Sequence, residues 1–440
     1  MQALDRFRTQ IGEESWQRLQ RRLVEVNGDI RRRGMRWYQT GPYEKLYLLT
    51  GYSYDEFFDW DLYFENLYLS YYGISRFCRN NVEAFLNRQY VNGYPPTGGL
   101  INKLEREHFK PFLAQNALLG CRQTGNYEWV AGRYYDRLKL YLDHWFWYWD
   151  FDKNGLCVWN SPHHSGMDSQ ESASWRMGWM QIEGVDLSCY LYRELEAMAI
   201  LAEKTGHGED KQEFIDHAER LGDLINGVLW DEEDGFYYDR NERTGEKVRL
   251  KTIAGLLPLW LGIVPKDRAE RLVHEHLLNE DEFWLKHPIA TWSKSAPGYY
   301  QERKKTECNW CGPVWIPTNY MIFHGLIRHG FKDAARELAY KSFDLVLAEE
   351  DTREYYNAET GAGQGLNPFW GWSALAYFMP LEYELGYDPS DQTRSALGCP
   401  ATRQPFDVAQ GCEPVERLAG EILRIGSDIM GASIAPDSER

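Results

Sequence analysis

Apolar residues recur with the spacing of an α-helix along most of this chain, and this periodicity constrains the fold more than any other feature. The stretches that carry it, most of them 10 to 20 residues long, are 16–26, 82–89, 129–147, 187–204, 211–229, 267–278, 320–329, 332–349 and 371–385. Alternating β-type runs are few and short, the clearest being 235–238 and 353–356. The pattern therefore predicts an all-α protein.

The segments between these helices are long and rich in Gly, Asp, Asn and Pro, which stop helices and set tight turns. Helix and loop alternate repeatedly, which favours a toroid of paired helices. An α-solenoid is the structural alternative, but we find no fixed repeat of 30 to 50 residues in the sequence. We expect one main domain over 1–390 and a partly flexible appendage over 391–440, where the composition shifts.

Charge and apolar runs exclude several classes of partner. The chain has 66 acidic and 49 basic residues and a net charge of −17, which argues against nucleic acid and anionic membranes. The N-terminal stretch 1–16 has no apolar signal core, and no apolar run reaches the ~18 residues of a membrane span. These features predict a cytoplasmic protein, and its scattered cysteines are expected to be reduced thiols.

Among the aromatic residues, Trp and Tyr greatly outnumber Phe, with 18 Trp and 29 Tyr against 19 Phe. Trp and Tyr rings carry a hydrogen-bonding group that Phe lacks. Two interpretations stay open at this point: a wet, aromatic-lined cavity, and an aromatic-rich core.

Four segments concentrate Trp together with acidic residues, Gly and Pro, and we interpret them as binding loops: 52–65, 159–178, 307–320 and 351–373. In the first, Asp59 and Asp61 flank Trp60. A carboxylate beside an indole suits a sugar, because the acid accepts hydrogen bonds from hydroxyls while the ring covers the apolar face. The same residues also fit a helix N-terminus, which favours acidic side chains.

In the second segment, Asp168 follows the small and flexible run 165–167, and several tryptophans including Trp175 are close in sequence. Indoles around a carboxyl group disfavour its charged form, so the pKa of Asp168 is expected to rise, as a general acid requires. The adjacent His163 and His164 raise a metal alternative, but neighbouring histidines point in different directions and no further ligand run accompanies them. We expect no metal and no cofactor.

In the third segment, Trp310 and Trp315 bracket a Gly-Pro turn, and Cys308 and Cys311 form a CxxC. No second CxxC exists to complete a zinc site, so packed thiols are the preferred interpretation.

In the fourth segment, Glu354 lies in a short extended run that precedes a Gly-rich loop and Trp372. Such a carboxylate is suited to activating water, although it could instead pair with Arg353. Elsewhere, 150–156 has the opening spacing of an EF-hand loop, but Ser161 occupies the position of the bidentate Glu. We interpret 150–156 as a helix-connecting turn.

Taken together, the four segments resemble the family 63 glycoside hydrolases, a clan related to the trehalases, and within it the mannosylglycerate and glucosylglycerate hydrolases. The motifs that carry the resemblance are Asp59-Trp60-Asp61, Ser165-Gly166-Met167-Asp168, Gly312-Pro313-Val314-Trp315 and Glu354-Tyr355-Tyr356 with Glu359-Thr360-Gly361. Their order matches over 52–385.

The resemblance implies an (α/α)6 barrel and hydrolysis with inversion at an α-glycosidic bond. It makes Asp168 the general acid and Glu354 the general base, with Glu359 as the rival base. The two carboxyl groups of an inverting pair should lie roughly 6.5–9.5 Å apart.

The resemblance also implies a set of sugar-binding positions and shows two departures from the family pattern. Cys311 stands where many members carry Arg, and Lys110 stands where relatives often carry Gln. A glycerate leaving group is anionic, so Lys110 and Arg176 are candidate cations for it. The residues expected to bind substrate are Trp60, Asp61, Asp59, Gln115, Lys110, Trp175, Arg176, Trp310, Trp315 and Trp372.

We therefore predict an inverting α-glycosidase for a small glycoside, first 2-O-α-mannosylglycerate and second glucosylglycerate. The alternatives are another family 63-like α-glucosidase, a sugar epimerase, or a non-catalytic sugar-binding toroid. An epimerase would use paired histidines, and apart from His163 and His164 the histidines lie outside the aromatic segments. The sequence leaves the oligomeric state open, a homo-oligomer included.

Overall fold

The computed structural model describes residues 3–38, 46–50, 56–57, 59–89, 98–99, 110–159, 162–170, 182–302 and 308–390. The predicted appendage 391–440 lies outside them, so the division at 390 stays a prediction. The helices are α1 (Ala3–Asp29), α2 (Asp59–Ser70), α3 (Arg76–Asn87), α4 (Leu113–Thr124), α5 (Arg133–Tyr148), α6 (Val185–Thr205), α7 (Lys211–Leu224), α8 (Pro258–Leu261), α9 (Lys266–Arg271), α10 (Ile316–Arg328), α11 (Lys332–Ala348) and α12 (Met379–Leu385). Shorter helical turns η1 (Ile30–Gly34), η2 (Pro162–Ser165), η3 (Ile225–Leu229), η4 (Ile253–Leu256), η5 (Leu272–Leu277) and η6 (Ser373–Tyr377) join them.

Strands contribute only small antiparallel pieces. They are β1 (Met35–Tyr38), β2 (Leu46–Leu49), β3 (Glu56–Phe57), β4 (Gly98–Gly99), β5 (Val158–Trp159), β6 (Ile182–Glu183), β7 (Trp230–Asp231), β8 (Phe236–Tyr237), β9 (Arg240–Asn241), β10 (Tyr355–Tyr356) and β11 (Gly363–Gln364). Both predicted extended runs contain a strand, β8 and β10. The expectation of an all-α class is confirmed.

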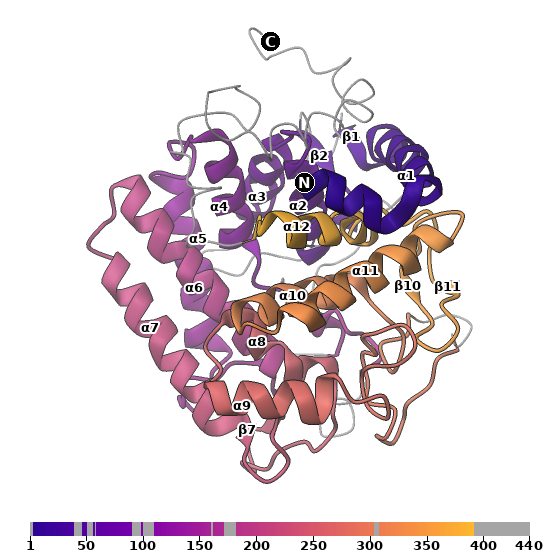
Figure 1. The fold of residues 1–440 in the computed structure, drawn as a ribbon. Coiled ribbons are helices and arrows are strands. Elements are labelled where there is room, and N and C mark those ends of the chain that lie inside the picture. The colour runs from indigo at the N-terminus through magenta and orange to yellow at the C-terminus, as the bar shows by residue number, and fades with distance from the viewer. Residues whose placement is uncertain are drawn as a thin grey trace, which may run out of the picture.

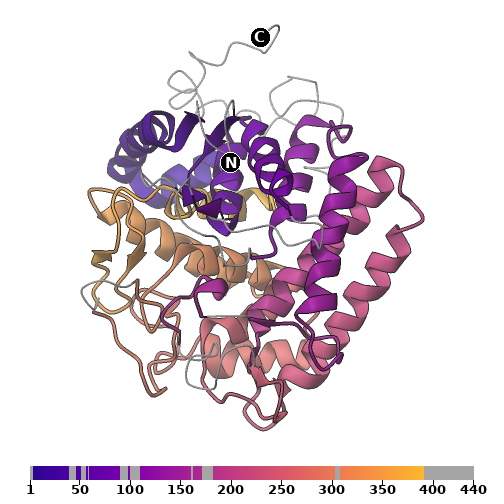
Figure 2. The same ribbon diagram turned by 180° about the vertical axis from the view of Figure 1, so that it is seen from behind.

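Among the described residues, α2, α4, α6, α8 and α10 form a closed inner ring together with η6. In this ring α2 packs against α4, α4 against α6, α6 against α8, α8 against α10, α10 against η6, and η6 against α2. Outer helices cover the ring, with α3 on α4, α7 on α6 and α11 on α10. Figure 1 shows α7 along the outer flank, and the reverse view in Figure 2 shows α6 and α7 again side by side. Six inner elements with an outer layer are the predicted (α/α)6 barrel.

Burial explains why the ring is built this way. Every residue of α2 from Trp60 to Ser70 is buried, whereas α7 alternates buried and exposed residues. A helix buried on every side is covered by other elements, while an amphipathic helix packs on it with one face and meets water with the other. The apolar core therefore lies between the two layers.

Two inner helices differ from the sequence-based expectation. The segment 52–65 was expected to be a loop, but it is helical from Asp59 onward, so Asp59-Trp60-Asp61 lies at a helix N-terminus, and its role in sugar binding stays a prediction. No helix was predicted at α4. Residues 113–121 are all buried, the polar Gln115 and Asn116 included, so polarity in this stretch does not mark a side that faces water.

The third and fourth aromatic segments lie side by side through a short backbone bridge. Val314 N–H donates to Tyr356 O at 2.7 Å, and Tyr356 N–H donates to Val314 O at 3.0 Å. Tyr355–Tyr356 also pairs with Gly363–Gln364 to form a hairpin. This pairing brings the loop of the expected general base against the Trp310–Trp315 segment.

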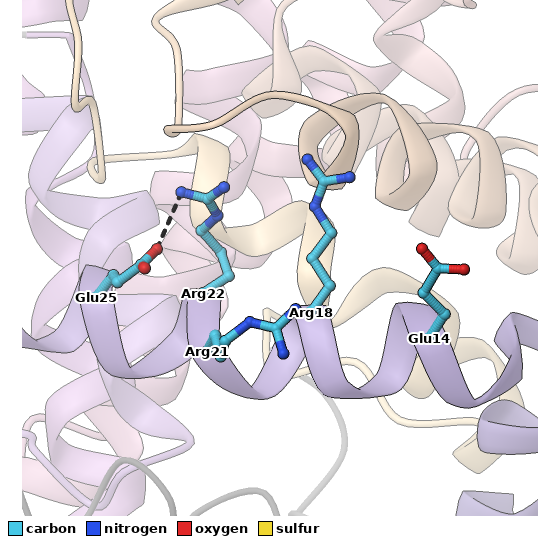
Figure 3. A pocket seen from close by; sticks show the side chains of 5 residues that line it. All are labelled: Glu14, Arg18, Arg21, Arg22 and Glu25. Carbon is cyan, nitrogen blue, oxygen red and sulfur yellow. Dashed lines mark ion pairs between the residues drawn. The ribbon is translucent and has the colours of Figure 1, made fainter.

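The C-terminal end of α11, which leads into that loop, is held by arginines of α1. Arg22 donates from Nη2 to Glu349 O at 2.7 Å and from Nη1 to Glu350 O, and Arg18 donates to Ala348 O at 2.7 Å. Cations suit the unpaired carbonyls at a helix C-terminus. Arg18 and Arg22 line a charged pocket on α1 together with Glu14, Arg21 and Glu25 (Figure 3).

Within the described ranges, we find no helix with both the length and the apolar character needed to cross a membrane.

Candidate active site

A cluster of buried aromatic rings occupies one end of the barrel. Trp310 stacks on Trp315 with ring centroids 3.8 Å apart, and Trp315 stacks on Tyr355 at 4.6 Å. Trp60, at the start of α2, lies 5.5 Å from Trp310 and 5.6 Å from Trp372. Three of the four aromatic segments thus meet here.

These rings are more deeply packed than an open sugar cavity would require. Trp60, Trp310, Trp315 and Trp372 are each at most 4% exposed. The Trp315 ring stacks with both Trp310 and Tyr355, so its contacts are with other protein side chains. These rings agree with the interpretation of an aromatic-rich core, while the wet aromatic-lined cavity stays a prediction.

The turn that carries Asp168 is bonded directly to the Trp310 segment. Trp310 N–H donates to Ser169 Oγ at 2.8 Å, and the Cys311 thiol lies 3.1 Å from Ser169 O. Gln170 donates from Nε2 to Trp310 O at 3.1 Å. Asp168 itself is partly exposed, and its Oδ2 accepts the Cys308 thiol at 3.1 Å.

Backbone groups orient Glu354. Leu366 N–H donates to Glu354 Oε2 at 2.9 Å, and Glu354 N–H donates to Leu366 O at 3.1 Å. Trp372 Nε1–H donates to Glu354 O at 2.9 Å. A hydrogen bond from a backbone N–H to a carboxylate favours its charged form, which a general base needs. The alternative pairing of Glu354 with Arg353 has no ion pair to support it, since Arg353 instead lies 3.8 Å from Glu349.

Glu359, the rival base, lies in a different environment. Its carboxylate accepts the Tyr299 hydroxyl at 2.9 Å and lies 3.8 Å from Lys294 Nζ, with its side chain 46% exposed. Glu359 is thus part of a surface hydrogen-bonded pair, whereas Glu354 is tied to the aromatic cluster through Trp372.

Asp168 contacts the Cys308 thiol, and the charge of Glu354 also acts on it. Burial is the largest cause that raises the pKa of Cys308, and the negative charges of Asp168 and Glu354 raise it further. The two carboxylates come from loops 186 residues apart in the sequence. The charges of both predicted carboxylates thus act on Cys308, while their roles as acid and base stay predictions.

Lys110 packs closely against the turn that leads to Asp168. Its side chain is buried, and its Nζ lies 5.5 Å from the centre of the Trp60 ring. A Cβ on Gly166 would meet Lys110 Cε at 2.2 Å and Trp60 Cζ2 at 2.9 Å. This lysine thus lies against Gly166, two residues before Asp168 in the 165–168 motif.

The remaining predicted binding residues differ in how they are placed. Gln115 is buried in α4, where Nε2 donates to Pro111 O at 3.1 Å. Asp61 is buried on α2, and its charge, after burial, raises the pKa of Glu65 one turn later. Asp59 is the first residue of α2. Trp175 and Arg176 lie outside the described residues.

Sequence reasoning missed two residues of this site. Cys308 was expected to be a packed thiol, but it contacts Asp168. Glu65 was not singled out, although it is a fully buried carboxyl next to Asp61. The position of Cys308 within the aromatic segment was the only available signal, because its partner lies 140 residues away.

In the part of the chain that the structure describes, no three His, Cys, Asp or Glu side chains are grouped as a metal site. In the EF-hand-like turn, Asp150 accepts Asn154 N–H and Gly155 N–H, both at 3.1 Å. Asp152 accepts Asn154 N–H at 3.1 Å. The carboxylates shape the turn, which leads from α5 to β5 rather than to another helix.

Known proteins resemble this chain in sequence and in fold. A mannosylglycerate hydrolase of Thermus thermophilus is 35% identical over 190 residues, covering 42% of this chain and 41% of that protein. A mannosylglycerate hydrolase of Rubrobacter radiotolerans is 27% identical over 179 residues, covering 40% and 39%. The chain thus spans about two fifths of the length of these curated relatives.

Among solved structures, a GH63 mannosylglycerate hydrolase from Thermus thermophilus in complex with Tris and D-glycerate superposes with a TM-score of 0.66. It is 22% identical, and the superposition covers 82% of this chain and 99% of that one. This likeness supports the barrel fold.

The family model described as "Mannosylglycerate hydrolase MGH1-like glycoside hydrolase domain" matches residues 54–373, nearly three quarters of the chain. That match includes all four aromatic segments apart from residues 52 and 53. The chain belongs to the family of mannosylglycerate hydrolase MGH1-like glycoside hydrolase domains.

Proposed function

We propose that this protein is an inverting α-glycosidase of a small anionic glycoside, with 2-O-α-mannosylglycerate as first substrate and glucosylglycerate as second. The observation that carries the proposal is the pair of carboxylates beside the aromatic cluster: Asp168 contacts Cys308, and Glu354 is tied to Trp372 through its backbone carbonyl and lies close enough for its charge to raise the pKa of Cys308. Membership of the family and the names of the relatives support the substrate class.

In the proposed reaction Glu354 takes a proton from water, and the water oxygen attacks the anomeric carbon. The bond from that carbon to the glycerate oxygen breaks, and Asp168 gives its proton to the departing oxygen. The products are the β-anomer of the sugar and glycerate. The Leu366 N–H bond to Glu354 Oε2 supports the role of base, because it favours the ionised carboxylate.

Three variants and one spectroscopic measurement test this proposal. With 2-O-α-mannosylglycerate as substrate, proton NMR should show the β-anomer first. Asp168→Ala and Glu354→Ala should each lower kcat by at least about 100-fold with unchanged unfolding temperature. Glu359→Ala is the matched carboxylate control and should stay near the wild-type rate, since Glu359 pairs with Tyr299 at the surface.

Each outcome has a clear meaning. An α-anomer as first product would refute inversion. Loss of activity in Glu359→Ala but not in Glu354→Ala would transfer the role of base to Glu359. Binding of the glycoside without turnover by the wild type would favour a sugar-binding toroid. Glucosylglycerate, trehalose and kojibiose, assayed in parallel, would define the substrate range.

Within the same proposal, Lys110 binds the carboxylate of the leaving group. A buried lysine against Gly166 of the acid-bearing motif suits an anion that departs from the oxygen protonated by Asp168. The relative solved in complex with D-glycerate supports the chemistry of this group.

Lys110→Met should therefore raise the KM for mannosylglycerate and leave the KM for an uncharged methyl α-mannoside unchanged. Lys294→Met removes the same charge at the surface and serves as the control. An unchanged KM for mannosylglycerate in Lys110→Met would remove Lys110 from the leaving-group subsite.

A further inference from the structure

The contact between Cys308 and Asp168 is a hydrogen bond in which the thiol is the donor and the carboxyl oxygen the acceptor. Cys308 Sγ lies 3.1 Å from Asp168 Oδ2. Burial, followed by the charges of Asp168 and Glu354, raises the pKa of the thiol above its usual range. A thiol that keeps its proton at neutral pH donates to a carboxyl oxygen.

The backbone on both sides of this contact is held in place, so the thiol and the carboxyl group cannot separate easily. Trp310 N–H binds Ser169 Oγ at 2.8 Å, and the Cys311 thiol lies 3.1 Å from Ser169 O. Asn309 accepts Cys311 N–H at 2.9 Å and donates to Tyr300 O at 3.0 Å. Residues 308–311 thus form a fixed edge along which the turn of Asp168 lies.

We propose that Cys308 is a positioning residue for Asp168, whose Oδ2 it holds so that the transferable proton resides on Oδ1. A carboxyl group has two oxygens, and only one can carry the proton toward the leaving oxygen. Because Oδ2 already accepts the thiol hydrogen, a proton on Oδ2 would face another hydrogen, whereas Oδ1 is suited to carry it. The inference rests on the proposed function, since it requires Asp168 to be the general acid.

The dependence of the rate on the leaving group separates this role from a purely structural one. A sugar alkoxide must be protonated as it departs, whereas fluoride is a weak base and needs much less protonation. A defect confined to proton delivery should therefore slow cleavage of mannosylglycerate and spare α-mannosyl fluoride. A general distortion of the site should slow both substrates alike.

The test compares kcat/KM on these two substrates for the wild type, Cys308→Ala, Cys308→Val and Cys308→Ser. We expect Cys308→Ala to lose about tenfold on mannosylglycerate and less than about twofold on the fluoride. The valine side chain is similar in size to cysteine but has no hydrogen-bond donor. Cys308→Val should therefore show the same two rate changes as expected for Cys308→Ala, and it keeps the test valid if the alanine variant folds poorly. Cys308→Ser keeps a donor and should recover most of the rate.

Cys311→Ala is the matched control, because this thiol touches the backbone of the same turn rather than the carboxyl group of Asp168. It should slow both substrates to the same extent. Equal losses on both substrates in Cys308→Ala and Cys308→Val, or no loss on either, would overturn the inference while the proposed function stands. A wild type that cleaves neither substrate would refute the proposed function itself.

Discussion

Substitution of Gly166 by Ala tests whether the close packing of Lys110 and Trp60 against Gly166 positions Asp168. Gly166 has a φ of +76°, and an added Cβ would lie 2.2 Å from Lys110 Cε and 2.9 Å from Trp60 Cζ2. Ordinary contact begins near 3.4 Å, so these neighbours or the turn must move by about 1.2 Å and about 0.5 Å respectively.

The indole is the less mobile neighbour. Trp60 is 2% exposed and packs against Trp310 and Trp372, so the turn and Lys110 should yield instead. Left-handed backbone costs an alanine about 1–2 kcal/mol, and overpacking adds about 1–3 kcal/mol. Because Asp168 is two residues away, a displacement of about 1 Å should lower kcat about 100-fold.

Gly206→Ala isolates the backbone contribution. Gly206 has a φ of +88°, and an added Cβ there would meet nothing within 4 Å. We expect both variants to lose free energy of unfolding in urea, and only Gly166→Ala to lose kcat and to raise the KM for mannosylglycerate. If Gly166→Ala kept kcat within about twofold and matched Gly206→Ala in stability, the packing of Lys110 and Trp60 against Gly166 would not position Asp168.

Two further predictions concern stability. Burial and the charge of Asp239 raise the pKa of Asp186 from 3.8 to about 7, so its stabilising contribution is complete below pH 3.8 and is lost as the pH rises through about 7. Asp186→Asn should remove this loss of stability with rising pH and be more stable than the wild type at pH 8, by on the order of 4 kcal/mol. If the free energy of unfolding in urea changed equally between pH 5 and pH 8 in the variant and the wild type, this prediction would be wrong. Arg22→Ala should lower the free energy of unfolding by about 2–3 kcal/mol, because it removes charged hydrogen bonds to the end of α11, whereas the exposed Arg21→Ala should change it by less than about 0.5 kcal/mol. Equal effects of the two arginine variants in urea unfolding would refute the role of Arg22.

Outer helices were predictable from the sequence because one side of each faces water. The expected helices 332–349 and 211–229 agree with α11 and with α7 and its extension η3 to within a residue. The inner helices α6 and α10 were also expected, at 187–204 and 320–329, whereas α2 and α4 were not. In α2 and α4 polar residues such as Asp61 and Gln115 are buried, so polarity in the sequence does not mark a side that faces water.

For the candidate site, residue types and order were enough to select Asp168 and Glu354 but not to describe their surroundings. The sequence did not predict that Trp310 and Trp315 stack on each other at 3.8 Å, and their contact with a sugar stays a prediction. Whether an indole faces a ligand or another indole depends on neighbours distant in sequence. The separation of the two carboxyl groups stays a prediction.

By itself, the sequence determined the alternation of helices and loops, the absence of long apolar runs and the residues with the chemistry of a glycosidase. Each of these depends on composition or on neighbours within a few positions. Only the tertiary structure decided that Cys308 holds Asp168 across 140 residues and that Lys110 lies against Gly166. Such contacts form when the ring of helices closes and brings together loops that are distant in the sequence. The separation of two loops along the chain does not predict their distance in space.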